Sequence, residues 1–503
     1  MSNQEPAQMI RAASKNEKRH IIRHELGFYH ALTLTGLYAL HDTDRSFDAE
    51  AIDYFIPALK HCIATHPILS AAIQGENTEE YAFIRPAQLN LQNHLRVINA
   101  APSAESSLPK DDLQWITRIN KNIHDEAFVK VDQQPPWKVY IVPLGHDKTT
   151  PETQRFYVIF AYSHSHGDGK SGLIFHRTFL EGLKIGHTLY DQSYTYQPPV
   201  SAIPSTLEES CDLKITWPYL ILNLLAGSMP TSVWRWFGFR PPLISNAWTG
   251  KPICYDPSSF STGSEVLLID KALVDSALKV CRKNGAKFTG LLNQLIVHAL
   301  DGILPKDKTA QSFVGQIVVD LKPLIPRYKV DDMANCASAL HETSGRSYPT
   351  TTLKQDPAFW NAVRQTTIDL ASCASTLTNQ PIGLLCYVPG LRSWMAQKLG
   401  GDRESSYEIS NLVTFDPRSP DRSVDIDASK REKWDIVRMI FSQPANALGS
   451  ALDFQVVSMK GGEMVITLNW QLGVLGVPHE DVFAREVLDR IHTSLTEICR
   501  PGT

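Results

Sequence analysis

The sequence predicts a protein of the α/β (α+β) class with two lobes, each a mixed β-sheet with flanking helices. With 503 residues, 43% of them hydrophobic and 20% charged, the chain can bury a large core, and its length favours two or more domains. Strand-like apolar runs alternate with helical patterns in both halves. A proline-rich stretch separates the halves. We therefore expect an N-terminal lobe over residues 1–195, a crossover linker over 196–262 and a C-terminal lobe over 263–503.

The first lobe is expected to contain a strand, a helix and then a β-hairpin. Residues 1–24 are polar and charged and indicate a mobile lead-in. Residues 31–40, ALTLTGLYAL, alternate in the manner of a strand. Residues 47–65 carry apolar side chains at helical spacing, around a proline that kinks or starts the helix. Two further strands, WKVYIVP at 137–143 and RFYVIFAY at 155–162, are joined by a charged loop and predict a hairpin.

The segment that follows this hairpin is the main candidate for a catalytic site. The apolar strand ends in the polar sequence SHSHGDG, residues 163–169, and a helical pattern then runs to Gly186. A histidine at this point, His164, is held by a buried strand while it faces a cleft. Its ordinary pKa of about 6.5 lets it accept a proton at neutral pH, as a general base must. The alternative is a loop histidine followed by an aspartate, Asp168, that only caps the next helix.

The second lobe is expected to alternate strands and helices around a second sheet. A strand at 265–269 leads to Asp270, which can cap a helix, and Thr289 can cap the next one. The remaining predicted elements are a strand at 312–321, a hairpin formed by 452–457 and 463–472, and a closing helix at 480–498. This order of elements is typical of an α/β sandwich.

One apolar stretch interrupts the crossover. It covers residues 215–237, with the run ITWPYLILNLLAGSM followed by Trp234, Trp236 and Phe237, and it is too short to span a bilayer. It can pack as an ordinary helix over the domain junction, line a hydrophobic acceptor channel, or lie weakly on a membrane surface. Its polar face lacks the run of lysines that interfacial helices usually carry. The three interpretations stay open at this point.

Charge and cysteine content exclude several other classes of protein. A net charge of −4 gives no electrostatic footprint for nucleic acid. The eight cysteines are scattered without a CxxC pair, which indicates reduced residues rather than a disulfide or zinc framework. The first residues lack the apolar region of a signal peptide, and no apolar run is long enough to span a membrane. We expect a cytoplasmic protein, with peripheral contact to a membrane surface as the open alternative.

The segment from His164 to Gly169, HSHGDG after an apolar strand, resembles the His-x-x-x-Asp-Gly motif of a large acyltransferase superfamily. The superfamily comprises chloramphenicol acetyltransferase, BAHD acyltransferases and the condensation domains of peptide synthetases. The chain most resembles the fungal alcohol O-acetyltransferases. The resemblance covers nearly the whole chain, is specific at this motif and is diffuse elsewhere. Condensation domains usually place a second histidine just before the catalytic one, where this chain has Ser163.

This resemblance implies roles for five residues. His164 would take the proton from an acceptor hydroxyl, and Gly169 would be the small residue that lets the turn pass close by. Asp168 would be structural, turned from the substrate and paired with a basic residue of the other lobe. The family commonly has an arginine soon after the strand that corresponds to residues 312–321, and this arginine binds the aspartate of the motif. Here Lys322 stands at the nearest matching place and Arg327 follows, and the sequence leaves open which one meets Asp168.

A second segment of the family concerns the thioester. Ser410 and Asn411 stand at the end of a short predicted strand and resemble the Ser-Asn segment of the acetyltransferases. Their polar groups would bind the thioester oxygen as charge builds in the tetrahedral intermediate. The alternative is a turn made of residues that favour turns. Residues 453–455, Asp-Phe-Gln, offer only a fragment of the Asp-Phe-Gly-Trp segment of plant members, so no role is carried over.

The resemblance as a whole implies a CoA-dependent O-acyltransferase. It would move an acetyl or short acyl group from acyl-CoA directly to the hydroxyl of a hydrophobic alcohol or secondary metabolite, without an acyl-enzyme. Acetyl-CoA is then a co-substrate, the partners are small molecules, and no permanently bound cofactor or metal is implied. We expect a monomer.

Two rival functions remain at this point. An N-acetyltransferase acting on an amine, such as a sphingoid base or a toxin, would use the same histidine. A non-catalytic binding protein of the same fold would keep His164 without the chemistry. A serine hydrolase is disfavoured, because the chain contains no Gly-x-Ser-x-Gly elbow.

Overall fold

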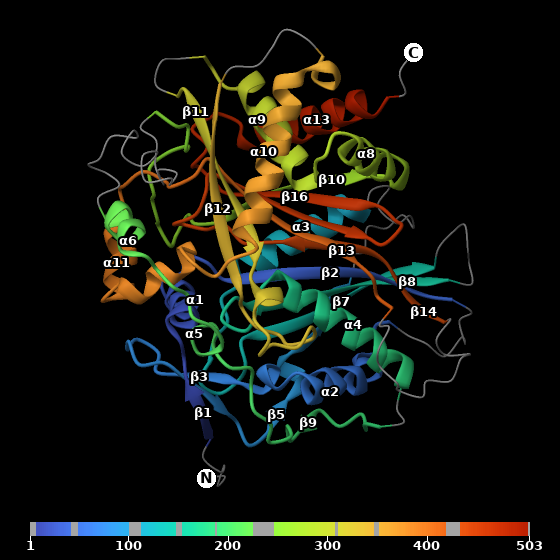
Figure 1. The fold of residues 1–503 in the computed structure, drawn as a ribbon. Helices are drawn as coiled ribbons and strands as arrows, with labels where there is room; N and C mark the ends of the chain where they lie inside the picture. Colours follow the sequence, from blue (N-terminus) through green and yellow to red (C-terminus); the bar gives the residue numbers. More distant parts are fainter. Residues whose placement is uncertain are drawn as a thin grey trace.

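The computed structural model describes residues 7–41, 49–99, 112–146, 153–186, 189–224, 246–306, 310–346, 352–418 and 433–500. These segments form two lobes, each built on its own large sheet, and their buried side chains form two separate apolar cores. Figure 1 shows one sheet above the other, with helices on their outer sides. The predicted α/β class with two lobes is confirmed.

The N-terminal lobe contains a five-stranded sheet. Its elements are β2 (Ala31–Leu40), β6 (Leu95–Val97), β7 (Trp137–His146), β8 (Gln154–Ser163), β14 (Trp434–Ser442), α2 (Ile56–Thr65) and α4 (Gly169–Ile185). The strands lie in the order β14-β2-β8-β7-β6, and only β6 and β7 are parallel. Every residue of β2 is buried, which suits its central place in the sheet. Helix α4 packs on this sheet with α2 alongside it.

The first sheet includes a strand from the second half of the chain. Strand β14 pairs antiparallel with β2, from Trp434 opposite Leu40 to Ser442 opposite Thr33. It covers an edge of β2 that would otherwise present unpaired backbone groups. Strand β14 thus ties the two lobes together. The division of the chain at residues 195 and 263 stays a prediction.

The C-terminal lobe contains a six-stranded sheet. Its elements are β10 (Thr262–Ile269), β11 (Ser312–Asp320), β12 (Ala337–Gly345), β13 (Tyr407–Phe415), β15 (Leu452–Met459), β16 (Met464–Gln471), α8 (Lys271–Lys283), α9 (Phe288–Ile303), α10 (Pro357–Cys373) and α13 (Glu480–Cys499). The strands lie in the order β10-β16-β15-β13-β11-β12, and β13 is parallel to both its neighbours. The four helices bury their apolar stripes on one face of the sheet, against residues such as Ile409, Phe454 and Ile466.

The opposite face of this second sheet is polar. Side chains alternate along a strand, so the neighbours of the core residues point to the other side. On β13 and β15 these neighbours are paired in register, Glu408 with Asp453 and Ser410 with Gln455. This face meets the N-terminal lobe, because Thr467 of β16 donates to a β14 carbonyl oxygen at 2.6 Å. A polar layer therefore lies between the lobes.

The expectation of a mobile lead-in over residues 1–24 is wrong for the part that the structure describes. Residues 8–12 form β1 (Gln8–Ala12), and α1 (Lys15–Glu25) follows. Ser14 caps this helix by accepting from the Glu17 amide at 3.3 Å, and the Glu17 carboxylate accepts from the Ser14 amide at 2.8 Å. This capping box, Ser-x-x-Glu, is visible in the sequence and is a signal for a helix start.

The remaining α-helices and strands lie outside the two large sheets. They are α3 (Asp112–His124), α5 (Leu207–Ser210), α6 (Trp217–Leu224), α11 (Leu391–Gln397), β3 (Ala72–Gln74), β4 (Ala82–Arg85), β5 (Leu89–Asn90) and β9 (Thr195–Tyr196). Strands β1, β4 and β3 form a small sheet, and β5 pairs with β9. Helix α3 packs against both β2 and β10, and so bridges the lobes.

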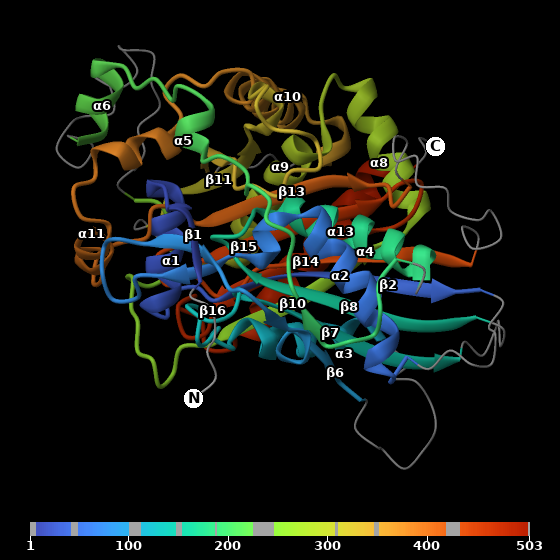
Figure 2. The same cartoon turned by 90° about the horizontal axis from the view of Figure 1, so that it is seen from below.

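The apolar stretch of the crossover is described only as far as α6. Trp217 and Leu224 on this helix are each 74% exposed. Figures 1 and 2 both show α6 at one end of the molecule. The rest of the stretch, with Trp234, Trp236 and Phe237, lies outside the described residues. Within the described ranges, no helix combines the length and the apolar character that a bilayer crossing requires.

Several histidines of the N-terminal lobe are buried in the neutral form. Burial lowers the pKa of His94, His124 and His176 to about 4 each. His124 is held between the Ala31 carbonyl oxygen and the Ser442 hydroxyl, both at 2.7 Å. An unfolded histidine titrates near a pKa of about 6.5, so between pH 6.5 and 4 the unfolded chain binds more protons than the folded one.

We predict that the free energy of unfolding is highest above pH 6.5 and falls as the pH decreases toward 4. Each of these histidines should contribute a slope of up to about 1.4 kcal/mol per pH unit in that window. Urea denaturation at pH 7.5, 6.5, 5.5 and 4.5 measures it. His124→Gln should reduce the slope by about one proton, whereas the exposed-site control His479→Gln should leave it unchanged. Stability that stays constant from pH 7.5 to 4.5 would contradict this prediction.

Candidate functional site

His164 follows directly after β8, where the strand turns into α4. Its Nδ1 atom lies 3.0 Å from the Gly167 carbonyl oxygen within the same turn. The side-chain nitrogen Nδ2 of Asn335, which precedes β12, lies 2.9 Å from the same Nδ1 atom and 3.1 Å from the His164 carbonyl oxygen. This histidine is thus held in place jointly by its own turn and by a loop of the C-terminal lobe.

These contacts define two neutral tautomers of His164. A carbonyl oxygen only accepts hydrogen bonds, so the Gly167 contact requires a proton on Nδ1. An amide NH2 group only donates, so the Asn335 contact requires Nδ1 without its proton. In the first tautomer, Asn335 donates to the His164 carbonyl oxygen instead. That tautomer leaves the Nε2 lone pair free, which is the arrangement that a general base needs.

The imidazole of His164 is surrounded by side chains of the N-terminal segment. The ring of His20 on α1 stacks on it, with centroids 4.0 Å apart, and the Tyr29 ring is 5.9 Å away. Arg19 contacts the His20 Nε2 atom at 3.0 Å, and the Arg23 guanidinium lies 4.4 Å above the centre of the Tyr29 ring. His164 as a whole residue is half-buried.

The surroundings keep His164 neutral. Burial, followed by the positive charges of Arg23 and Arg19, lowers its pKa to about 3. Burial also lowers the pKa of the Arg19 guanidinium to about 9, with the charge of Arg23 acting in the same direction. At neutral pH the imidazole is therefore unprotonated.

Asp168 joins the turn to both lobes. As the N-cap of α4, its Oδ1 atom accepts from the Ser171 amide at 3.1 Å and from the Ser171 hydroxyl at 3.2 Å. Its Oδ2 atom accepts from the Cys336 amide in the C-terminal half at 3.3 Å. The carboxyl group is buried and faces these donors, so Asp168 does cap the helix, as one of the two alternatives drawn from the sequence expected. The structural role implied by the resemblance stays a prediction.

The basic partner expected for Asp168 is absent from ion-pair distance among the residues that the structure describes. Lys322 donates to the Asp332 carbonyl oxygen at 2.8 Å, and Arg327 donates to the Glu209 carbonyl oxygen at 3.1 Å. Burial raises the pKa of Asp168, and the charge of Lys322 opposes that rise. Lys322 therefore acts on Asp168 through space rather than by direct contact, and Arg327 is engaged elsewhere.

The small size of Gly169 has a direct structural reason. A Cβ atom at this position would lie 2.7 Å from Leu412 Cδ2 and 2.9 Å from Phe441 Cζ. Leu412 belongs to β13 and Phe441 to β14, so the start of α4 sits closely against strands of the second half. A side chain at residue 169 would push the turn away from them.

Ser410 and Asn411 lie on β13 and have different surroundings. The Asn411 side chain donates to the Thr289 hydroxyl at 3.1 Å and accepts from the Val413 amide at 2.8 Å. Val413 has a φ of +66°, and the pairing of β13 with β15 shifts register here, so Asn411 supports an irregular strand end. Ser410 is buried on the polar face of the sheet, beside Gln455. A role for either residue with the thioester stays a prediction.

A polar network next to His164 was not predicted from the sequence. The Tyr29 hydroxyl donates to Gln443 Oε1 at 2.7 Å, and Gln443 donates to Glu408 Oε1 at 3.3 Å. Gln316 donates to the other Glu408 oxygen at 2.6 Å. Burial raises the pKa of Glu408. The alternation of polar and apolar residues along β13 could have indicated a polar face, but not that this face lies between the lobes.

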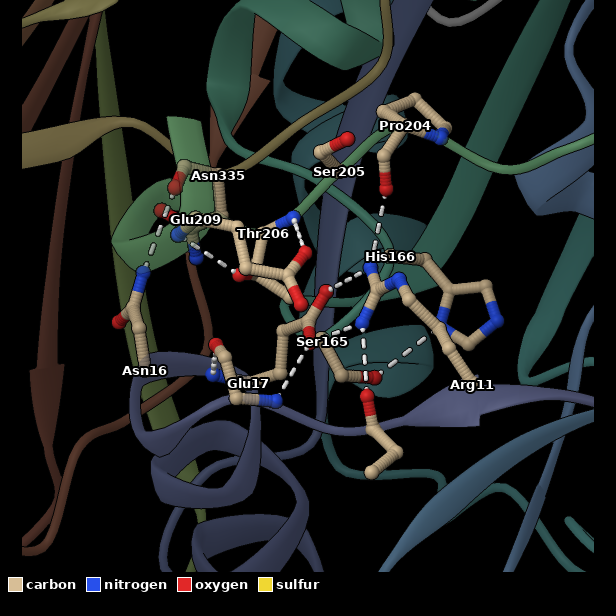
Figure 3. Close-up of polar contacts among 12 residues, drawn as sticks. Arg11, Asn16, Glu17, Ser165, His166, Pro204, Ser205, Thr206, Glu209 and Asn335 are labelled. Atoms are coloured by element: carbon tan, nitrogen blue, oxygen red, sulfur yellow. Dashed lines mark hydrogen bonds and ion pairs between the residues drawn. The ribbon is translucent and has the colours of Figure 1, made fainter. Parts of the chain in front are cut away.

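A small cavity of about 20 Å³ lies beside Ser165 and His166 of the His164–Gly169 segment, and Figure 3 shows the polar contacts around it. Its lining includes Arg11, Glu17, Ser165, His166 and Asn335. Arg11 and Glu17 form an ion pair at 2.7 Å, and His166 is anchored to the Ala71 carbonyl oxygen at 2.8 Å. This volume suits about one water molecule and not a substrate.

Within the described ranges, no group of three or more histidine, cysteine or acidic side chains is arranged for a metal ion.

Comparison with known proteins bears on this geometry. A family model described as alcohol acetyltransferase matches residues 105–476 of the chain. The chain belongs to the alcohol acetyltransferase family. The resemblance inferred from the motif is confirmed, and the family indicates an acetyltransferase that uses acyl-CoA as co-substrate and a small-molecule acceptor.

Two relatives of this family member share its length. A probable alcohol acetyltransferase, FCK4, of Fusarium pseudograminearum is 23% identical, with 93% of this chain and 91% of the relative covered. A probable alcohol acetyltransferase, crmB, of Aspergillus fumigatus is 22% identical, with 92% and 94% covered.

Solved structures of low identity share the fold of this acetyltransferase. TRI3 trichothecene 15-O-acetyltransferase from Fusarium sporotrichioides superposes with a TM-score of 0.64 at 11% identity, covering 98% of this chain and 95% of that one. The first condensation domain of the calcium-dependent antibiotic synthetase gives a TM-score of 0.57 at 13% identity, covering 100% and 98%.

We predict that Asp168→Asn lowers both stability and activity. The amide has one acceptor oxygen in place of two, so either the Ser171 or the Cys336 amide loses its partner, at a cost of about 1–3 kcal/mol. Thermal unfolding and kcat with acetyl-CoA measure the two effects. Asp489→Asn, an exposed site on α13, is the matched control. A variant with native melting and native rate would contradict the proposed structural role.

Proposed function

We propose that this protein transfers an acetyl or short acyl group from acyl-CoA directly to the hydroxyl of a small-molecule acceptor, with His164 Nε2 as the general base. The observation that carries the proposal is the geometry of the His164 ring. It is neutral, it is anchored through Nδ1 by the turn, and it belongs to a half-buried residue at the boundary between two lobes. Membership of an acetyltransferase family supports the same reaction.

The reaction follows from these contacts. His164 Nε2 removes the hydroxyl proton while the oxygen attacks the thioester carbonyl carbon. The Gly167 carbonyl oxygen, which accepts from Nδ1, stabilises the resulting imidazolium. When the tetrahedral intermediate collapses, the C–S bond breaks and the imidazolium returns its proton to the thiolate, giving the ester and free CoA. General base assistance of this kind typically contributes a factor of roughly 10² to 10⁴, and alignment of both substrates supplies much of the remainder.

Charge on the tetrahedral oxygen requires a hydrogen-bond donor. Ser410 and Asn411 are our candidates by resemblance, and of the two Ser410 fits better. Asn411 already uses its amide on Thr289 and on the Val413 backbone. The Ser410 hydroxyl lies on the polar face between the lobes, two residues from Glu408.

The choice of a hydroxyl acceptor rests on the charges near His164. A protonated amine would meet the positive charges of Arg19 and Arg23, which already act on the His164 ring. The hydrophobic character predicted for the acceptor came from the crossover, and the described part of it, α6, has its Trp217 and Leu224 turned to solvent.

The experiment that tests this proposal measures thiol release from acetyl-CoA with matched panels of alcohols and amines. An O-acyltransferase releases CoA with alcohols and forms the ester. Turnover with amines alone would establish an N-acyltransferase, and no thiol release with any acceptor would identify a binding protein of the same fold.

We predict that His164→Ala lowers kcat by at least about 10²-fold, because the general base is lost. Melting temperature and acetyl-CoA affinity should remain close to those of the wild type. Among the described residues, the His164 side chain makes a hydrogen-bond contact with the other lobe only at Asn335. Steady-state kinetics and calorimetric titration measure these quantities, with the exposed His479→Ala as control. A kcat comparable to the wild-type value would defeat the assignment.

A further inference from the structure

The polar face between the lobes contains buried polar atoms without partners. On β15, Asp453 is 5% exposed and Gln455 1% exposed, and both point to the polar face between the lobes. Neither Asp453 Oδ1 nor Gln455 Nε2 has a hydrogen-bond partner in the described chain. Buried acceptors and donors of this kind cost free energy unless something binds them. They mark a place where a ligand or water must supply the missing bonds.

Two arginines of α1 face the same space. Arg19 and Arg23 are one helical turn apart, so they share a face of the helix. Their Nε atoms are buried without a partner among the described residues, and Arg23 stacks over Tyr29 without donating a side-chain hydrogen bond there. The Tyr29 ring under Arg23 lies 5.9 Å from the His164 ring. The Tyr29 hydroxyl leads through Gln443 to Glu408, which stands opposite Asp453 in the sheet. An unpartnered guanidinium so close to the base is a ready donor to an oxygen atom.

The balance of donors and acceptors decides what kind of molecule fits. The unpartnered atoms are of both kinds, an acceptor at Asp453 Oδ1 and donors at Gln455 Nε2 and the Nε atoms of the two arginines. A carboxylate or phosphate ligand could not donate to Asp453, and an ammonium ligand could not accept from the arginines. A hydroxyl group both donates and accepts, so a ligand with several hydroxyls can donate to Asp453 and accept from Arg19 and Arg23 at the same time.

We propose that Arg19, Arg23 and Asp453 form the acceptor subsite of this enzyme, and that the acceptor is a neutral compound carrying several hydroxyl groups near the one that is acylated. This assignment rests on the proposed O-acyl transfer, and it replaces the hydrophobic alcohol expected from the crossover. The added hydroxyls bind the subsite while the reacting hydroxyl meets His164 Nε2.

Ring alcohols of one size test the subsite. Cyclohexanol, cis-cyclohexane-1,2-diol and cyclohexane-1,2,3-triol differ in their hydroxyl count and keep the same carbon ring. In the wild-type protein with acetyl-CoA, kcat/KM should rise by about tenfold or more from cyclohexanol to the triol. Arg23→Met and Asp453→Asn should reduce that ratio to near one, and Arg23→Lys should retain only part of it because lysine lacks the planar fork.

Two controls keep the outcomes distinct. Arg282→Met, an exposed site on α8, should preserve the wild-type ratio, and thermal melting identifies any variant that does not fold. Calorimetric binding of the triol and of cyclohexanol to His164→Ala with CoA measures the subsite without turnover. If no acceptor releases thiol but the triol still binds more tightly, dependent on Arg23, the subsite stands and the proposed catalysis fails. Equal affinity and equal turnover for cyclohexanol and the triol, or a preference that survives Arg23→Met, would overturn the subsite.

Discussion

The contact between the β8–α4 turn and the short segment before β12 is the constraint on which the rest of the site depends. Asp168 accepts from the Cys336 amide, and the neighbouring Asn335 contacts both the ring and the carbonyl oxygen of His164. Two adjacent residues of one lobe thereby fix two residues of the other. Because the turn is also capped internally by Ser171, His164 is held at the boundary of the lobes by short bonds in place of a long-range ion pair.

The polar layer between the lobes has an energetic cost that the fold must offset. Buried ionisable groups such as Arg23 and Asp453 lose their hydration, and good hydrogen bonds must compensate for that loss. Part of the compensation comes from amides, since Gln443 and Gln316 donate to Glu408. The unpartnered Nε atoms of Arg19 and Arg23 belong to the helix whose His20 stacks on His164. In the proposed subsite, the two arginines that depress the pKa of this histidine also contact the acceptor, which would link the state of the base to acceptor binding.

Local patterns predicted the parts of the site that are local in structure. The strand, the glycine-bearing turn and the helix that carry His164 and Asp168 are contiguous, so sequence alone revealed them. The choice between Lys322 and Arg327 could not be made, because it depends on how a loop packs 150 residues away from the motif. Helix α1 was not predicted, because its polar composition indicated a mobile segment despite the capping box at its start. The contribution of Arg19 and Arg23 was missed with it. The polar face of β13 and β15 acquires meaning only from the strand order of the sheet.

The central claim is that His164 presents an unprotonated Nε2 at neutral pH, with its proton on Nδ1 and donated to Gly167. Nitrogen-15 NMR of histidine-labelled protein at pH 7 measures this most directly, with the His164 signals identified by their loss in a His164→Gln sample. The structure predicts a neutral ring in the Nδ1–H tautomer, with the Nε2 resonance of an unprotonated nitrogen. An Nε2–H tautomer or an imidazolium at pH 7 would contradict it.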